Sequence, residues 1–354
     1  MNNELTLGLA LLGGAVLAGV VAHGAWTARK TAARAPRRSD PHDPMPGLPD
    51  QTDGVGDMLG DTVPLAVTGV AGTSLPPVKK GGPRLDALID AIAVISVDHP
   101  LTGEQVMAHL PSTRRAGSKS FMIEGLRADC GEWEPPQTGV TYSELQAGAL
   151  LANRLGGLNE IEYSEFVQKI QAFADSLGAG VEFPDMLDVV ARSKELDAFA
   201  SAHDAQLAMR LFAKGSAWSV GYLQQQAGRH GFVPGVLPGR LVMPGLEEGA
   251  PPVLTLHFDA QAAFADDPDQ ASLREVQLAF DVPQTAAEQE PFKSWCAAGE
   301  ALSLALDAFM ADDQGRAFAP AAFHAIETEL QRLYEALAQR DLAAGSAAAR
   351  RLFS

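Results

Sequence analysis

Hydrophobic residues form one long uninterrupted run at the start of the chain and shorter periodic patterns further along. From Leu5 to Val21 no charged residue occurs, and the apolar character continues to Trp26. About 20 apolar residues are enough to cross the core of a bilayer as a helix. The alternative is a cleaved signal peptide, but here the basic cluster follows the run instead of preceding it. The pattern therefore predicts an uncleaved transmembrane anchor over residues 1–27.

The stretch after the anchor is dense in Pro, Gly and Asp and shows neither the helical nor the strand period. Residues 28–84 are therefore predicted to form a disordered linker. Its basic residues, from Arg29 to Arg38, lie next to the anchor. The positive-inside rule then places the rest of the chain in the cytoplasm and only a short amino-terminal stub outside.

After the linker, strand and helix patterns alternate in two series of similar order. The first unit, 85–203, is expected to have strands over 91–97, 118–126, 141–153 and 180–184 and helices over 102–110, 160–178 and 186–202. The second unit, 204–342, is expected to have strands over 206–213, 239–244, 251–260, 275–283 and 308–318 and helices over 216–228, 290–308 and 319–341.

This repetition predicts a duplicated α+β domain, since the two series lie about 115 to 130 residues apart, too long a period for a solenoid. Each unit is expected to be an antiparallel sheet with helices on one face and the other face open. Residues 343–354 are predicted to be a tail.

Charge narrows the range of functions. Lys and Arg number 27 against 44 Asp and Glu, so the net charge is −17 and nucleic-acid phosphates would repel the protein. The stretch from Ala28 to Arg84 is nearly neutral, so this acidity belongs to the two folded units. Only Cys130 and Cys296 are present, which excludes a disulfide framework and fits a reducing compartment.

Catalytic motifs are missing from the sequence: neither a phosphate-binding loop nor HExxH, GxSxG or CxxC occurs. Asp98 beside His99 lacks a nucleophile, and surface or capping roles explain the pair. His324 and Glu327 share a helix face without a second metal-binding pair. The sequence therefore predicts a protein that is not an enzyme and holds neither a cofactor nor a metal.

Strand alternation in the second unit separates residues that face the helices from residues on the open face. The open face could accept an amphipathic peptide, with Arg210 binding an acidic group, or it could be an ordinary solvated surface. The residues predicted to form this candidate partner-binding face are Ala208, Arg210, Phe212, Val253, Thr255, His257, Gln277 and Ala279.

Three segments of the second unit resemble the carboxy-terminal domain of the bacterial ZipA family of cell-division proteins. These are AQLAMRLFA (205–213), EVQLAFDVP (275–283) and ADDQGRAFAPAAFHAIETELQRL (311–333). The plan of anchor, basic and Pro-rich tether and terminal α+β domain is also similar. The chain departs from the family in having two such units and a shorter tether.

The resemblance implies a single-pass protein of the bacterial inner membrane with a periplasmic amino terminus. Its partner would be the C-terminal peptide of the tubulin-like GTPase FtsZ, docked on the open sheet face so that FtsZ filaments are held at the septum. The alternative is a membrane-anchored structural assembly protein whose two units pack on each other and bind no FtsZ peptide.

Overall fold

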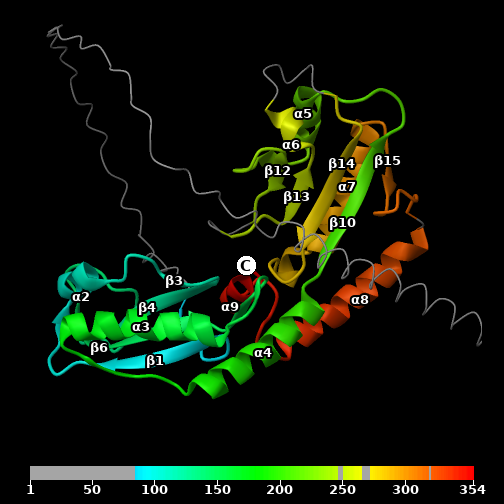
Figure 1. The fold of residues 1–354 in the computed structure, drawn as a ribbon. Helices are drawn as coiled ribbons and strands as arrows, with labels where there is room; N and C mark the ends of the chain where they lie inside the picture. Colours follow the sequence, from blue (N-terminus) through cyan, green and yellow to red (C-terminus); the bar gives the residue numbers. More distant parts are fainter. Residues whose placement is uncertain (1–83, 246–249, 265–271, 319) are drawn as a thin grey trace, which may run out of the picture.

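A computed structural model describes residues 84–245, 250–264, 272–318 and 320–354 (Figure 1). The predicted anchor, 1–27, lies outside the described residues, as does all but the last residue of the predicted linker, 28–84. Within the described part of the chain, none of the helices combines the length and the apolar character that a membrane span requires.

The first unit is built on an antiparallel sheet with the strand order β3-β4-β6-β1-β9. Short strands β2 and β5 pair with β6 and β4, and β7 and β8 form a separate hairpin. The strands are β1 (Asp90–Ser96), β2 (Leu101–Thr102), β3 (Arg115–Ala116), β4 (Lys119–Arg127), β5 (Trp133–Glu134), β6 (Thr141–Leu150), β7 (Ala152–Asn153), β8 (Gly156–Gly157) and β9 (Gly180–Glu182).

The helices of this unit begin and end where local sequence signals predict. Thr102 caps α2 (Gly103–His109) in a capping box with Gln105, because each satisfies a backbone N–H of the other. Gly178 ends α3 (Glu160–Leu177) in the left-handed conformation that glycine adopts readily. The unit closes with α4 (Met186–His203).

The second unit is built on an antiparallel sheet with the strand order β11-β12-β13-β14-β10-β15. Its strands are β10 (Gln206–Ala213), β11 (Val233–Pro234), β12 (Arg240–Met243), β13 (Leu254–His257), β14 (Glu275–Asp281) and β15 (Ala308–Ala311). Its helices are α5 (Val220–Arg229), α6 (Ala260–Ala263), a 3-10 turn (Ala287–Gln289), α7 (Pro291–Ala305) and α8 (Pro320–Ala338).

The two sheets share the order of their central strands. In the first, β6, β1 and β9 are neighbours, and in the second β14, β10 and β15 are neighbours. A long helix, α3 or α7, lies in the chain between the first and the last strand of each set, and another long helix, α4 or α8, follows. The protein is thus α+β with antiparallel sheets, as the sequence pattern predicts, and the central strands follow a corresponding order in the two large sheets.

Each sheet buries a core against its long helix. In the first unit the rings of Phe121 on β4 and Phe166 on α3 meet edge to face, with centroids 5.7 Å apart. In the second unit Trp295 of α7 is fully buried, and its indole N–H donates to the Leu278 carbonyl of β14 at 3.0 Å. Figure 1 shows α7 against one face of β14 and β10.

The segment predicted as a tail, 343–354, completes the first unit. It contains α9 (Ala347–Leu352), and Leu352 and Phe353 are fully buried in the first core. Arg351 hydrogen-bonds both carboxylate oxygens of Asp90, at 2.6 and 2.7 Å, and this carboxylate is fully buried. The chain therefore runs from the first unit into the second and back, and the segment is not a free tail.

The face of the first sheet opposite α3 is partly covered, contrary to the expected open face. Asp90 lies on that face and is held by Arg351 of α9. Leu85 lies directly over Gly148 of β6, where an added Cβ would come within 2.3 Å of it. The Leu85 N–H also donates to the buried Glu124 carboxylate at 3.0 Å. The second sheet therefore provides the better candidate for an open binding face.

The two units contact each other at one end of the second sheet and along α4 and α8 (Figure 1). Arg154, in the turn between β7 and β8, lies 2.6 Å from a carboxylate oxygen of both Asp204 and Asp281. The Arg340 guanidinium, just after α8, lies 4.7 Å from the centre of the Phe199 ring on α4. The first contact links the first unit to the end of β14, and the second links α4 to the end of α8.

Candidate functional site

Alternation along three strands of the second unit separates its core from its open face. The residues expected to point toward the helices do belong to the core of this unit. They are Leu207, Met209 and Leu211 on β10, Leu254 and Leu256 on β13 with Phe258 just after it, and Val276, Leu278 and Phe280 on β14 with Val282 just after it. Among the described residues, the opposite side chains therefore form a face on the side of the sheet away from the helices that pack on this core.

Strand register arranges seven of the eight predicted site residues in rows across this face. Thr255, Ala279 and Ala208 are directly opposite one another on β13, β14 and β10. His257, Gln277 and Arg210 form the next row. In the row after that, Phe212 lies between Glu275 and Phe309. The strand register therefore places these seven predicted residues on one face of the sheet, since directly opposite residues in a ladder share a face.

Two predicted site residues are buried. Val253 is 7% exposed and belongs to the core, so its expected outward orientation is wrong. The reason is that β13 begins only at Leu254, and Val253 lies before the regular alternation, with its N–H donating to the Met243 carbonyl. Ala279 lies in the expected row, between Thr255 and Ala208, but is only 1% exposed.

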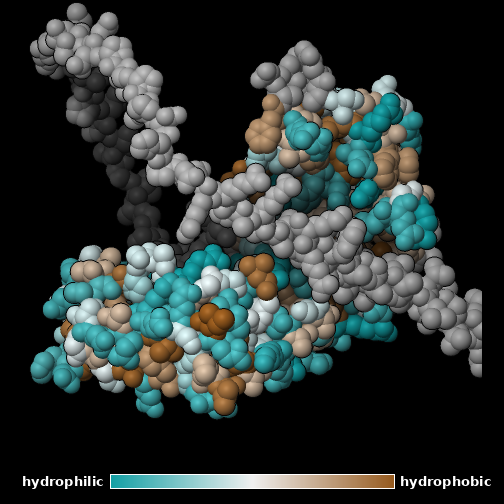
Figure 2. Space-filling view, viewed as in Figure 1, coloured by the Kyte–Doolittle hydropathy of each residue, from teal (hydrophilic) through white to brown (hydrophobic). Residues whose placement is uncertain are grey.

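An aromatic pair at the edge of the face was not predicted. The rings of Phe212 on β10 and Phe309 on β15 stack with centroids 5.4 Å apart, and Phe309 is 38% exposed. The sequence contained a signal for Phe309, since the neighbouring Met310 packs against the core and alternation sends Phe309 outward. Figure 2 shows hydrophobic residues next to hydrophilic ones over this part of the unit.

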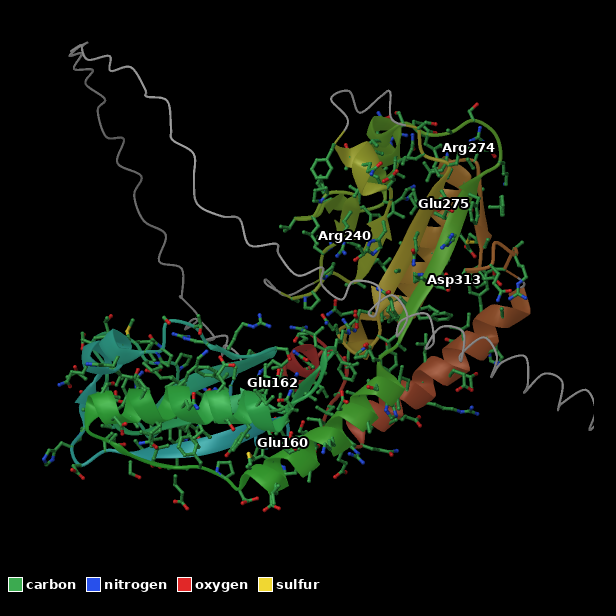
Figure 3. All side chains as sticks on the ribbon, viewed as in Figure 1. Glu160, Glu162, Arg240, Arg274, Glu275 and Asp313 are labelled. Atoms are coloured by element: carbon green, nitrogen blue, oxygen red, sulfur yellow. The ribbon has the colours of Figure 1, made fainter. Side chains whose placement is uncertain are left out.

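Basic groups dominate the middle row of the face. The Arg210 guanidinium lies 3.5 Å from the Glu275 carboxylate. Arg240 on β12 is directly opposite His257, and it too escaped the sequence prediction because no face was assigned to β12. Burial, and then the charge of Arg240, lower the pKa of His257 below its usual value of 6.5. Figure 3 shows Arg240 and Glu275 on this sheet.

The first unit closes one end of the face. Asp281, the last residue of β14, accepts a hydrogen bond from Arg154 of the first unit at 2.6 Å. Burial raises the pKa of Asp281, although the nearby Arg154 charge works in the opposite direction. The accessible part of the face therefore begins at the Thr255 row and ends at the Phe309 edge.

The other candidate residues form no second site. His324 and Glu327 are both exposed on α8, and Cys130 is exposed in its loop. Cys296 packs against the core of the second unit as expected, and burial raises its pKa to about 11. Across the described residues, no three His, Cys, Asp or Glu side chains lie close enough together to hold a metal ion.

Comparisons with known proteins give no family assignment: no family model matches the chain, and no curated protein is significantly similar to it.

Proposed function

We propose that this protein is a membrane tether of bacterial cell division that binds the C-terminal peptide of FtsZ on the open face of the second sheet. Its amino-terminal apolar run would anchor it in the inner membrane, with the bulk of the chain cytoplasmic. In this role the protein holds FtsZ filaments at the septum and performs no chemistry.

The observation that carries the proposal is the one-sided construction of the second sheet. Leu223 of α5, Trp295 of α7 and Phe323 of α8 all pack on the same core. The opposite face keeps an exposed aromatic edge at Phe309 and a partly exposed Arg210, whose side chain is 34% accessible. A sheet face with apolar and basic groups suits an amphipathic peptide. The resemblance of three segments to the ZipA family supplies the identity of the partner.

The second candidate function is a structural assembly in which the two units pack on each other. The contacts of Arg154 with Asp204 and Asp281 favour it, because they join the turn between β7 and β8 of the first unit to the second unit. In this alternative the anchor concentrates the protein for self-assembly, and FtsZ does not bind.

Vesicle flotation separates the two functions. Vesicles carrying the full chain are mixed with FtsZ filaments or with filaments of FtsZ lacking its C-terminal peptide. The tether proposal expects only intact FtsZ to float with the vesicles. If neither form floats, or if both float equally, peptide capture is excluded, and cross-linking of the chain to itself then tests the assembly alternative.

A further inference from the structure

Three basic side chains form a row across the open face of the second sheet. Arg240 is directly opposite His257, His257 is opposite Gln277, and Gln277 is opposite Arg210. Directly opposite side chains on one face stand about 5 Å apart. The row therefore crosses β12, β13, β14 and β10 and carries a guanidinium at each end, an imidazole inside it and the Gln277 amide, another hydrogen-bond donor.

This row contrasts with the rest of the molecule. The chain has a net charge of −17, yet the row contains no carboxylate. Among the described residues, Arg240 has no ion-pair partner, and Arg210 has only Glu275 at 3.5 Å. The Glu275 side chain is 56% exposed, and exposed ion pairs are weak. A ligand carboxylate could therefore replace Glu275 at little cost and find an unpaired arginine at the other end.

The rows on either side supply apolar contacts. Val242, Thr255, Ala279 and Ala208 form a row of small or aliphatic side chains. On the other side of the basic row, Phe212 and Phe309 form the aromatic edge, in a row that also holds Glu275. An extended peptide lying on this face would contact apolar side chains on both sides of a central row of hydrogen-bond donors. Arginine is well suited to bidentate binding of carboxylates.

We infer that the open face recognises its peptide through acidic side chains, whose carboxylates bind the row formed by Arg210, His257 and Arg240. This inference rests on the proposed function for the location of the site, and it specifies the chemistry of the partner segment: acidic residues interspersed with apolar ones. The two arginines then determine which peptides bind, and the aliphatic row on one side and the aromatic pair on the other add contact area.

Proton uptake at His257 follows from this arrangement. The groups directly opposite His257 are Arg240 from β12 and Gln277 from β14, and neither is acidic; Arg210 lies one strand further and pairs with Glu275, two residues before Gln277 on β14. Its pKa lies below 6.5 in the free protein, because of burial and of Arg240, so the ring is neutral near neutral pH. A bound carboxylate favours the protonated ring. Affinity should therefore rise as the pH falls toward the pKa of the free ring, which lies below 6.5, while the ligand carboxylates are still ionised.

The test measures binding of labelled peptides to the full chain in detergent by fluorescence anisotropy. One probe is the FtsZ C-terminal peptide, with a version in which Asp and Glu are replaced by Asn and Gln. The other is a short peptide of alternating Leu and Asp, with its Leu and Asn counterpart. The acidic member of each pair should bind about tenfold more tightly, and added salt should reduce this difference.

Three single substitutions locate the effect. Arg210→Gln and Arg240→Gln should each weaken binding of the acidic peptides about fivefold and leave the neutral peptides unchanged. His257→Gln should keep the affinity measured at high pH and lose the increase at low pH. Arg332→Gln is the matched control, because Arg332 pairs with Glu329 on the exposed surface of α8 and should change nothing.

The outcomes separate this inference from the proposed function. If both members of the FtsZ pair bind equally and Arg240→Gln has no effect, recognition of carboxylates is excluded although FtsZ remains the partner. If the FtsZ peptide fails to bind while the Leu and Asp peptide binds through Arg210 and Arg240, the recognition chemistry stands and the partner is another protein. Failure of both acidic peptides to bind overturns the inference.

Discussion

The buried pair of Asp90 and Arg351 makes the clearest prediction at the scale of single residues. The Asp90 carboxylate is fully buried, and Arg351 donates two hydrogen bonds to it. Removing one partner of such a pair leaves a buried charge uncompensated. We expect Arg351→Met to lower the free energy of unfolding of residues 84–354 by about 3 kcal/mol in urea titrations.

The control for this prediction is Arg332→Met on the exposed face of α8. Its pair with Glu329 is largely solvated, so we expect a change of less than about 0.5 kcal/mol. Equal effects of the two substitutions would mean that the pair of Asp90 and Arg351 does not stabilise the fold.

Alternation in the sequence predicts most of the open face residue by residue. It fails at Val253 because a strand has to begin before its alternation can be followed, and β13 begins one residue later. It misses Arg240 and Phe309 because each lies on a short strand of four residues, where the period is hard to assign from sequence. Their place in the site depends on pairing with β13 and β10, which the chain alone does not specify.

At the scale of elements, α2 docks on the loop before β6 through a glycine. A Cβ at Gly103 would lie 1.6 Å from the Gln137 carbonyl oxygen, and the Gly103 N–H donates to the Val140 carbonyl at 2.7 Å. Gly103→Ala should therefore displace α2 from this loop. We expect a loss of about 2 kcal/mol in thermal or urea unfolding, despite the higher helix propensity of alanine.

Gly228→Ala in α5 provides the matched control. A Cβ there meets nothing within 4 Å, so only helix propensity acts. We expect this substitution to raise the free energy of unfolding by about 0.5 to 1 kcal/mol. A stabilising effect at Gly103 as well would contradict the close contact with Gln137.

Element boundaries follow closely from local signals, because capping residues act over one turn. Thr102 with Gln105 and the glycine at 178 mark helix ends in both sequence and structure. The prediction of a helix over 216–228 places the start of α5 too early, because Ser219 is the capping residue and accepts the N–H of Tyr222. Trp218, just before the cap, is buried, and its indole N–H donates to the Leu306 carbonyl.

At the scale of the whole molecule, the return of the chain to the first unit makes a prediction. Deleting residues 347–354 removes the buried Leu352 and Phe353 and leaves Asp90 unpaired. Loss of one large core side chain alone costs about 3 to 5 kcal/mol, which is comparable to the stability of many domains. We expect hydrogen exchange of α3 and β1 to accelerate greatly while α7 keeps its protection. Unchanged exchange of α3 would contradict the assignment of α9 to the first core.

This return could not be predicted from the sequence. Asp90 and Arg351 are separated by 261 positions, and no local pattern in either segment indicates that the two residues pair. The sequence indicates a tail at residues 343–354 because the core residues that contact this segment lie in the first unit, far away along the chain. The α+β fold with antiparallel sheets, by contrast, is predictable, because strand and helix patterns alternate locally along the chain.

The most direct test of the central claim is equilibrium binding of the FtsZ C-terminal peptide to residues 84–354. We predict saturable binding at protein concentrations up to about 100 μM. It should be abolished by Arg210→Glu combined with Phe309→Glu, both on the open face, and unchanged by Arg332→Glu on α8. Absence of binding, or binding that the face variant leaves intact, would contradict the assignment of the open face as the docking site.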